Sequence, residues 1–202
     1  MTTRFTDEQI EVLLKPLAST RIAKRNISGS SMSYLQAYDV RAHMIRMFGF
    51  GGFDIETLDC DLVYEMERTI GQDKKPGYDI AYRARVRLEV AGEPTGEDGY
   101  AERAVYTEVA IGNAVGPVSN RADLHDNAAK SAVSDAMKRC AINLGTQFGL
   151  GLYNSGQTSD IVRKIVGRDT EAEKMTPEQE KMLSDSLGAT EIEGSDPDGD
   201  KP

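Results

Sequence analysis

The strongest constraint on the fold comes from residues 78–90, YDIAYRARVRLEV, in which apolar and charged side chains alternate. Successive side chains of a β-strand point to opposite faces, so this pattern predicts a strand with one buried and one exposed face. The predicted core face holds Ile80, Tyr82, Ala84, Val86, Leu88 and Val90, and the exposed face holds Asp79, Arg83, Arg85, Arg87 and Glu89.

Two further strand-like runs, residues 53–66 and 102–112, flank this strand. The connecting segments GQDKKPG and GEPTGEDG are short and rich in turn residues, which favours antiparallel pairing of neighbouring strands. Residues 53–112 therefore predict a three-stranded antiparallel meander.

A long helix is predicted over about residues 121–144, where small and apolar side chains recur at helical spacing. We expect its apolar stripe to pack on the meander, which gives an α+β fold with a β-β-β-α core. The stripe consists of Ala129, Ala132, Val133, Ala136, Met137, Cys140 and Leu144.

Two more helices are predicted before the meander. Thr6 and Gln9 form a capping box that opens a short helix ending at Lys15. A basic connector that closes with the turn-rich ISGSS leads to a second helix over residues 33–49, which Gly49 ends. The apolar side of this second helix is predicted to hold Leu35, Tyr38, Ala42, Ile45 and Met47.

Charge divides the chain into two parts. Residues 168–202 hold eleven acidic and four basic residues, a net charge of −7, whereas residues 1–167 hold 22 and 20, a net charge of −2. We predict a folded domain over residues 1–167 and a mostly disordered acidic tail over residues 168–202, with a small helix at 176–187. The two cysteines form no C-x-x-C pair, and neither a signal peptide nor a membrane span is evident, so a cytoplasmic location is expected.

Basic residues gather in two regions of the domain. Residues 20–46 carry five bases and one acid, and Lys24, Arg25 and Arg41 among them are candidate contacts to nucleic acid. On the middle strand, three arginines at alternate positions would stand about 6.5–7 Å apart, near the phosphate step of a single strand. The alternative is a solvated face on which the arginines pair with acids of the neighbouring strand. These arginines are Arg83, Arg85 and Arg87, and the acids are Glu56, Asp59 and Asp61.

The long helix carries its own basic residues. Lys130, Ser134 and Lys138 recur at steps of four, and Arg139 follows Lys138 directly. These bases are candidates to bind phosphates, and the alternative is that Lys138 or Arg139 pairs with Asp135 at helical spacing. The pattern by itself favours the local ion pair.

Three segments resemble those of a known family in their order and spacing. They are SYLQAYDVRAHMIRMFGFGGF, the meander with its YTEVAIG strand, and AAKSAVSDAMKRCAINLG. From residue 32 to about residue 153 the chain resembles the Rad52 family of single-strand annealing proteins of eukaryotes and bacteriophages. This resemblance implies a core that assembles into rings or filaments, with single-stranded DNA held by its backbone in a basic groove.

By this resemblance, Lys138 and Arg139 correspond to the family's DNA-contacting basic pair, and Lys130 to an earlier basic position. Family arginines align with Asp39 and Ile142, where this chain differs. Arg41 is the candidate to replace the first of them. The groove is then expected to depend on Arg83, Arg85 and Arg87.

The implied function is ATP-independent binding and annealing of single-stranded DNA in recombination and repair, in a bacterial or phage-infected cell. The sequence contains no G-x-x-x-x-G-K-[ST] loop, and no cofactor is expected. His43 and His125 lack partners at metal-ligand spacing. We interpret His43 as a surface or core residue and His125 as a neighbour of the long helix's start.

Three alternatives stay open. The protein protects single-stranded DNA without annealing it, or it is a metal-dependent nuclease. The nuclease hypothesis rests on four acids that share one strand face only if the strand carries a bulge or a twist: Asp54, Glu56, Asp59 and Asp61. A double-stranded RNA-binding domain has the same element order, but it is much shorter, and its second helix opens with a lysine cluster that is missing here.

We interpret the acidic tail as a solubilising end. The functional alternatives are recruitment of a single-strand-binding protein and competition with DNA for the basic groove. Deleting residues 168–202 tests the second of these, because an unchanged affinity for single-stranded DNA would exclude competition.

Overall fold

The computed structural model describes residues 5–27, 30–94, 101–153, 156, 158–159 and 161–165. The chain divides into two units, Met1–Lys164 and Ile165–Pro202, and the description below concerns the first. The predicted disordered tail and the helix at 176–187 lie outside the described residues. The predicted domain boundary after residue 167 stays a prediction.

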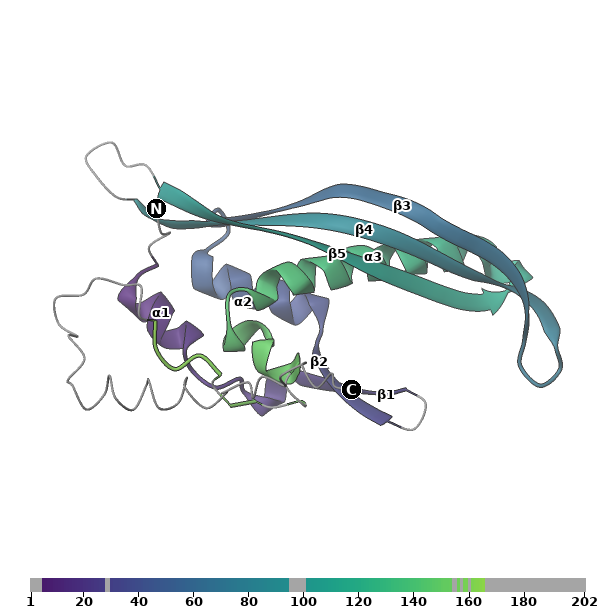
Figure 1. The fold of residues 1–202 in the computed structure, drawn as a ribbon, viewed down its shortest axis with the longest axis horizontal. Coiled ribbons are helices and arrows are strands. Elements are labelled where there is room, and N and C mark those ends of the chain that lie inside the picture. The colour runs from purple at the N-terminus through teal and green to yellow at the C-terminus, as the bar shows by residue number, and fades with distance from the viewer. Residues whose placement is uncertain are drawn as a thin grey trace, which may run out of the picture. The chain divides into compact units, whose positions relative to one another are not determined.

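Three long strands form an antiparallel sheet in the order β3-β4-β5. They are β3 (Phe53–Ile70), β4 (Lys75–Pro94) and β5 (Ala101–Pro117). The long helix α3 (Arg121–Ile142) packs along one face of this sheet (Figure 1). The predicted α+β fold is therefore confirmed. The strands are longer than predicted, because ladder pairing continues into polar residues beyond the alternating apolar pattern.

Alternation along β4 creates the two faces of the sheet. Ile80, Ala84, Val86, Leu88 and Val90 are fully buried, as predicted. The buried stripe of α3 lies against this face, and it includes four of the predicted residues and three others. These are Ala132, Ala136, Met137 and Cys140, with Leu124, Ala128 and Ala141 in place of the half-buried Ala129 and Val133.

The backbones of the sheet and of α3 come close together at Gly112 of β5. A Cβ atom at this position would lie 2.3 Å from the backbone nitrogen of Ala132 and 2.4 Å from the carbonyl oxygen of Ala128. Two backbones can come this close only where the strand residue has no side chain. Gly112 therefore sets the distance between the sheet and the helix.

β3 contains two single-residue bulges. The register with β4 shifts between Thr57 and Asp59, and again between Leu62 and Tyr64. An extra residue moves the following side chains to the opposite face, because side chains alternate along a strand. The first bulge therefore brings Asp59 onto the exposed face, as the sequence required for the four acids to share one face.

The first helix, α1 (Asp7–Leu13), opens with the predicted capping box. The Thr6 hydroxyl accepts a hydrogen bond from the backbone N–H of Gln9, and the Gln9 side chain accepts one from the N–H of Thr6. The helix ends two residues earlier than predicted.

The prediction of a basic connector between the first two helices is wrong. Its residues form an antiparallel hairpin of β1 (Ile22–Ile27) and β2 (Ser30–Leu35). Its strands carry mostly polar and small side chains, because little of the hairpin contributes to the hydrophobic core. For this reason the alternating apolar signal of a strand is weak here.

The second helix, α2 (Ala37–Phe48), begins four residues later than predicted, because β2 occupies the preceding segment. Gly49 follows it with a positive φ of 75°, as expected of a helix-ending glycine. The predicted apolar side is wrong for Tyr38, which is 70% exposed. The side of α2 that faces the core holds Val40, His43 and Met44.

Candidate nucleic-acid interface

A groove of about 790 Å³ lies between the β1–β2 hairpin and α3. We call it the hairpin groove. Figure 1 shows α3 with the sheet on one side and the hairpin on the other. The floor is closed by residues of α2 and of the turns that follow α3, including Val40, Phe148 and Leu152.

One side of α3 forms a wall of the hairpin groove. Ser131, Asp135, Lys138 and Ile142 line it, at the steps of three and four that keep residues on one helical face. The Lys138 side chain is 23% exposed, and its Nζ lies 2.7 Å from Oδ1 of Asp135. The predicted local ion pair is therefore confirmed, with Lys138 as the partner.

The hairpin forms the facing wall. Arg25 stands opposite Met32 in the hairpin register, and both line the groove. Tyr34 of β2 lines it too, and the Lys138 Nζ lies 5.7 Å from the centroid of its ring. A cation over an aromatic face is favourable. The groove thus combines two cations with one aromatic ring, drawn from opposite walls.

A partly buried ion pair holds the root of the hairpin. Nη2 of Arg21 lies 2.8 Å from Oδ2 of Asp39, with each side chain 13% exposed. Arg21 also donates to the carbonyl oxygen of Gln147, whose own amide donates to the carbonyls of Lys15 and Pro16. Arg21 therefore ties the root of the hairpin to Asp39 of α2 and to the turn after α3.

His43 lies in the core next to this network, and its ring centroid is 5.1 Å from that of Phe148. Within the described residues, neither ring nitrogen has a hydrogen-bond partner. Burial, followed by the positive charges of Arg21 and Arg46, lowers the pKa of His43 to about 4, and Asp39 opposes this only in part. The interpretation of His43 as a core residue is confirmed.

Acid is expected to destabilise the protein through His43. The unfolded imidazole takes up a proton near pH 6.5 and the folded one only near pH 4, so the unfolded state binds more protons between these values. The free energy of unfolding then falls as the pH falls, by on the order of 3 kcal/mol across the window. Urea unfolding at about pH 7.5 and about pH 5 measures the part of this loss above pH 5, about 2 kcal/mol. It should be smaller in His43→Phe, and an equal loss in both proteins would contradict the assignment.

The structure brings only some of the predicted contacts together. Arg25 and Lys138 line the hairpin groove. Lys130 pairs with Asp126 one turn earlier on α3 and is 72% exposed. The other predicted contacts are exposed and lie outside the groove lining, so their contacts with DNA stay predictions. They are Lys24, Arg41 and Arg139.

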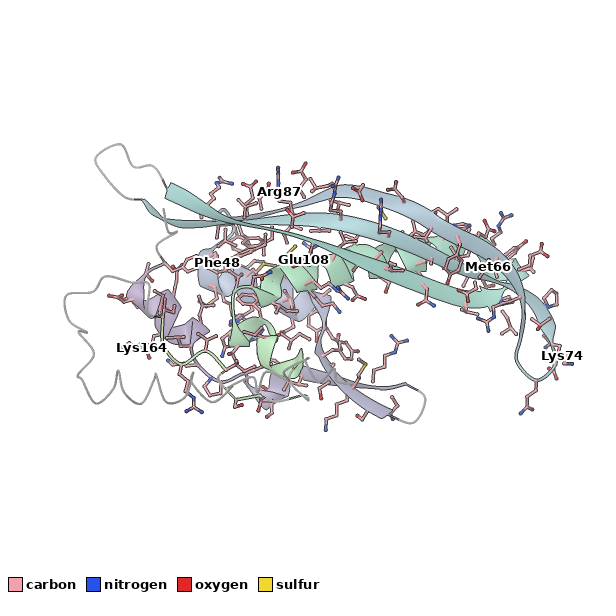
Figure 2. All side chains as sticks on the ribbon, in the orientation of Figure 1. Phe48, Met66, Lys74, Arg87, Glu108 and Lys164 are labelled. Atoms are coloured by element: carbon pink, nitrogen blue, oxygen red, sulfur yellow. The ribbon has the colours of Figure 1, made fainter. Side chains whose placement is uncertain are left out.

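The arginine row of β4 lies on the face of the sheet that points away from α3, where Figure 2 labels Arg87. None of these three arginines lines the hairpin groove. All three arginines pair with acids of β3, as the alternative interpretation predicted, and DNA binding by this separate face stays a prediction. The pairs are Arg83–Asp61 at 3.3 Å, Arg85–Asp59 at 2.8 Å and Arg87–Glu56 at 2.6 Å.

A third polar cluster lies where the start of α3 meets the sheet. The Tyr82 hydroxyl lies 3.1 Å from Nδ1 of His125, which confirms His125 as a neighbour of the helix start. Nε of Arg121 lies 2.6 Å from Oε1 of Glu65 and lowers the pKa of that carboxyl. These contacts fasten the first turns of α3 to the sheet.

Among the described residues, no three His, Cys, Asp or Glu side chains are placed to hold a metal ion. None of the described helices is long and apolar enough to cross a membrane.

Comparison with known sequences decides the family. The model of the Rad52/22 family double-strand break repair protein matches residues 6–168, which is most of the chain. The chain belongs to the Rad52/22 family. The comparison with curated proteins finds no match. The resemblance seen over residues 32–153 is thereby confirmed, and the family match extends it to include α1 and both strands of the hairpin.

Membership of the Rad52/22 family places the protein in DNA recombination and repair, with DNA and further copies of itself as partners. Proteins of this family are annealing proteins rather than classical enzymes. Sequence reasoning missed Tyr34 as a groove residue, because its segment was assigned to a helix. The available signal was an aromatic residue nine positions after Arg25.

Proposed function

We propose that this Rad52/22-family protein binds single-stranded DNA in the hairpin groove and anneals complementary strands without ATP, as a ring or filament. The observation that carries this proposal is the convergence of Arg25, Lys138 and Tyr34 in one groove. Cations on both walls suit a phosphate backbone, and the exposed part of an aromatic ring suits a base or sugar.

Annealing by such a groove needs no bond-making chemistry by the protein. Each base-pair step formed supplies roughly 1.4 kcal/mol of stacking, so the complementary strand itself provides the driving force. The protein contributes by holding a strand extended. Assembly of many copies raises the effective concentration of groove sites along that strand. No cofactor is needed for this work.

A strand-annealing assay tests the proposal. Two complementary oligonucleotides labelled for energy transfer should pair faster with the protein in EDTA and without nucleotide. If Arg25, Lys138 and Arg139 each release a counterion, affinity should fall with a log–log salt slope of roughly −2 per subunit. Binding without faster pairing would instead support a protecting protein, and strands shortened in magnesium would support a nuclease.

The acidic tail extends the proposal to a second partner. We propose that residues 168–202 recruit a single-strand-binding protein, in the cytoplasm of a bacterial or phage-infected cell. The tail has the net negative charge and polar composition of an exposed interaction segment. The annealing assay on strands coated with the host's single-strand-binding protein tests this. Deletion of the tail should slow annealing on coated strands only, and equal rates would exclude recruitment.

A further inference from the structure

The hairpin groove is lined by more apolar side chains than charged ones. Its charged lining residues are Arg25, Lys138 and Asp135, and the carboxylate of Asp135 repels phosphate. The apolar side chains offer a phosphate no polar partner, so the backbone of a strand can use only part of the lining. They are Met32, Leu35, Val40, Ile142, Phe148 and Leu152.

Met32 is 58% exposed although it belongs to this lining. It stands directly opposite Arg25 in the hairpin register, and Tyr34 follows two residues later on β2. Directly opposite residues of paired strands share one face, and so do alternate residues of one strand. Arg25, Met32 and Tyr34 therefore lie on one face of the hairpin, and all three line the groove.

The ring of Tyr34 already has a cation over one of its faces. The Lys138 Nζ lies 5.7 Å from the ring centroid, across from the hairpin on α3. The Tyr34 side chain is only half-buried, so part of it stays accessible from the groove. Lys138 thus limits how the ring can turn, and it leaves the other face or the ring edge for a ligand.

A nucleobase matches this face of the hairpin better than a phosphate does. Unpaired bases are flat and aromatic, and they stack on aromatic side chains with little regard to sequence. A methionine side chain is flexible, and its sulfur makes favourable contacts with aromatic rings. The exposed thioether of Met32 beside the Tyr34 ring therefore gains more from a base than from a phosphate.

We propose that Met32 and Tyr34 form a base-binding subsite on the hairpin, in which a base of the bound strand packs against the thioether and the ring. Arg25, directly across from Met32, holds a phosphate next to that base. This rests on the proposed function, and it adds that the strand is held by a base as well as by its backbone. The base in this subsite is unavailable for pairing until it leaves.

Two ligands with the same number of phosphates test the proposal. One is an oligothymidylate, and the other is an abasic oligonucleotide of equal length, which keeps the sugars and phosphates and lacks every base. Met32→Ala should weaken binding of the oligothymidylate by about fivefold and leave binding of the abasic strand unchanged. Fluorescence anisotropy measures both affinities. The abasic strand is equally flexible for every protein tested, so its flexibility cancels between variants.

Met66→Ala is the matched control. Met66 is 54% exposed on β3 and lies outside the groove lining, so this variant should bind both ligands as the wild type does. Circular dichroism checks that the Met32→Ala variant is folded. An equal loss for both ligands in Met32→Ala, or no loss for either, would overturn the base-binding subsite.

Cross-linking locates the base directly. An oligothymidylate in which 5-iodouracil replaces some bases forms a covalent link to a neighbouring side chain under ultraviolet light, and the reactive carbon belongs to the base. Mass spectrometry of the digested protein should find the link on Met32 or Tyr34. Links confined to other residues, or none at all, would contradict the proposal.

Failure of this proposal can be told apart from failure of the proposed function. Replacing Lys138 and Arg139 by alanine removes charge, so it should weaken binding of both ligands by a similar factor. If it weakens neither, the hairpin groove is not the DNA site, and the proposed function fails with it. If it weakens both while Met32→Ala weakens neither, the groove binds the backbone and only the base-binding subsite is wrong.

Discussion

Replacing Lys138 and Arg139 together by alanine is expected to abolish annealing and to weaken single-stranded DNA binding by about 100-fold. Each lost contact to a phosphate is worth about 1.5 kcal/mol, and 1.4 kcal/mol is a tenfold change in affinity. The fold should survive, because Arg139 is exposed and Lys138 loses only a local ion pair with Asp135 and its position over Tyr34. Fluorescence anisotropy with a labelled oligonucleotide measures the affinity.

The matched control is Arg83→Ala with Arg85→Ala, which removes the same charge from the opposite face of the sheet. Both arginines are paired with β3 acids, so affinity should change by no more than a few-fold. An equal loss in the two double variants would mean that net charge, rather than the hairpin groove, holds the DNA. Normal annealing by the Lys138→Ala, Arg139→Ala variant would show that these two side chains have a structural role instead of binding DNA.

A substitution at Asp135 should change the affinity for single-stranded DNA in the opposite direction. Its carboxylate lines the groove and binds the Lys138 amine, so it competes with phosphate for that cation. Asp135→Asn should therefore tighten binding, and weaker binding would show that this carboxylate positions Lys138 for DNA.

Gly112→Ala is expected to cause the largest loss of stability. The added methyl group would meet the α3 backbone at Ala132 and Ala128, and a backbone cannot rotate out of the way as a side chain can. Overpacking of this kind costs about 3 kcal/mol, which for a domain of this size lowers Tm by roughly 6–12 °C. Thermal unfolding followed by circular dichroism measures the change.

Gly116→Ala is the matched control for Gly112→Ala. It lies four residues further along the same strand, and its new Cβ would meet the end of the Leu124 side chain at 2.7 Å. That side chain can change rotamer, so the loss should be much smaller. Equal losses at the two glycines would show that the α3 backbone yields as readily as Leu124 does.

The sheet and the long helix could be predicted because their periodicity is produced by burial on one side. Leu88 and Val90 alternate with charged residues since β4 has one face in the core, and Ala132 and Ala136 repeat on α3 for the same reason. The hairpin could not be predicted in this way. It is stabilised by the pairing of β1 with β2 and by Arg21 at its root, and neither leaves an apolar period.

The candidate site was predicted only in part, because it is formed between segments far apart in the chain. The helix pattern marked Lys138 as lying off the core stripe, and the family resemblance gave it a role. Neither shows which residues face it, and Arg25 and Tyr34 do so only because the hairpin folds back against α3. The β4 arginines had the expected spacing, but the acids that neutralise them depend on the register and on a bulge.

The two bulges of β3 have opposite effects on which side chains face the helix. The first moves the side chains that follow it to the opposite face, and the second restores the original phase from Tyr64 onward. Each bulge accommodates one extra residue, Leu58 at the first and Val63 at the second, while the pairs on both sides of it stay in register. Deleting Leu58 would therefore leave Asp59 opposite Arg85 and Asp61 opposite Arg83, within a regular strand. A deletion between the two bulges would instead turn the side chains beyond it to the other face. The two bulges are therefore the positions at which this strand tolerates the loss of a single residue.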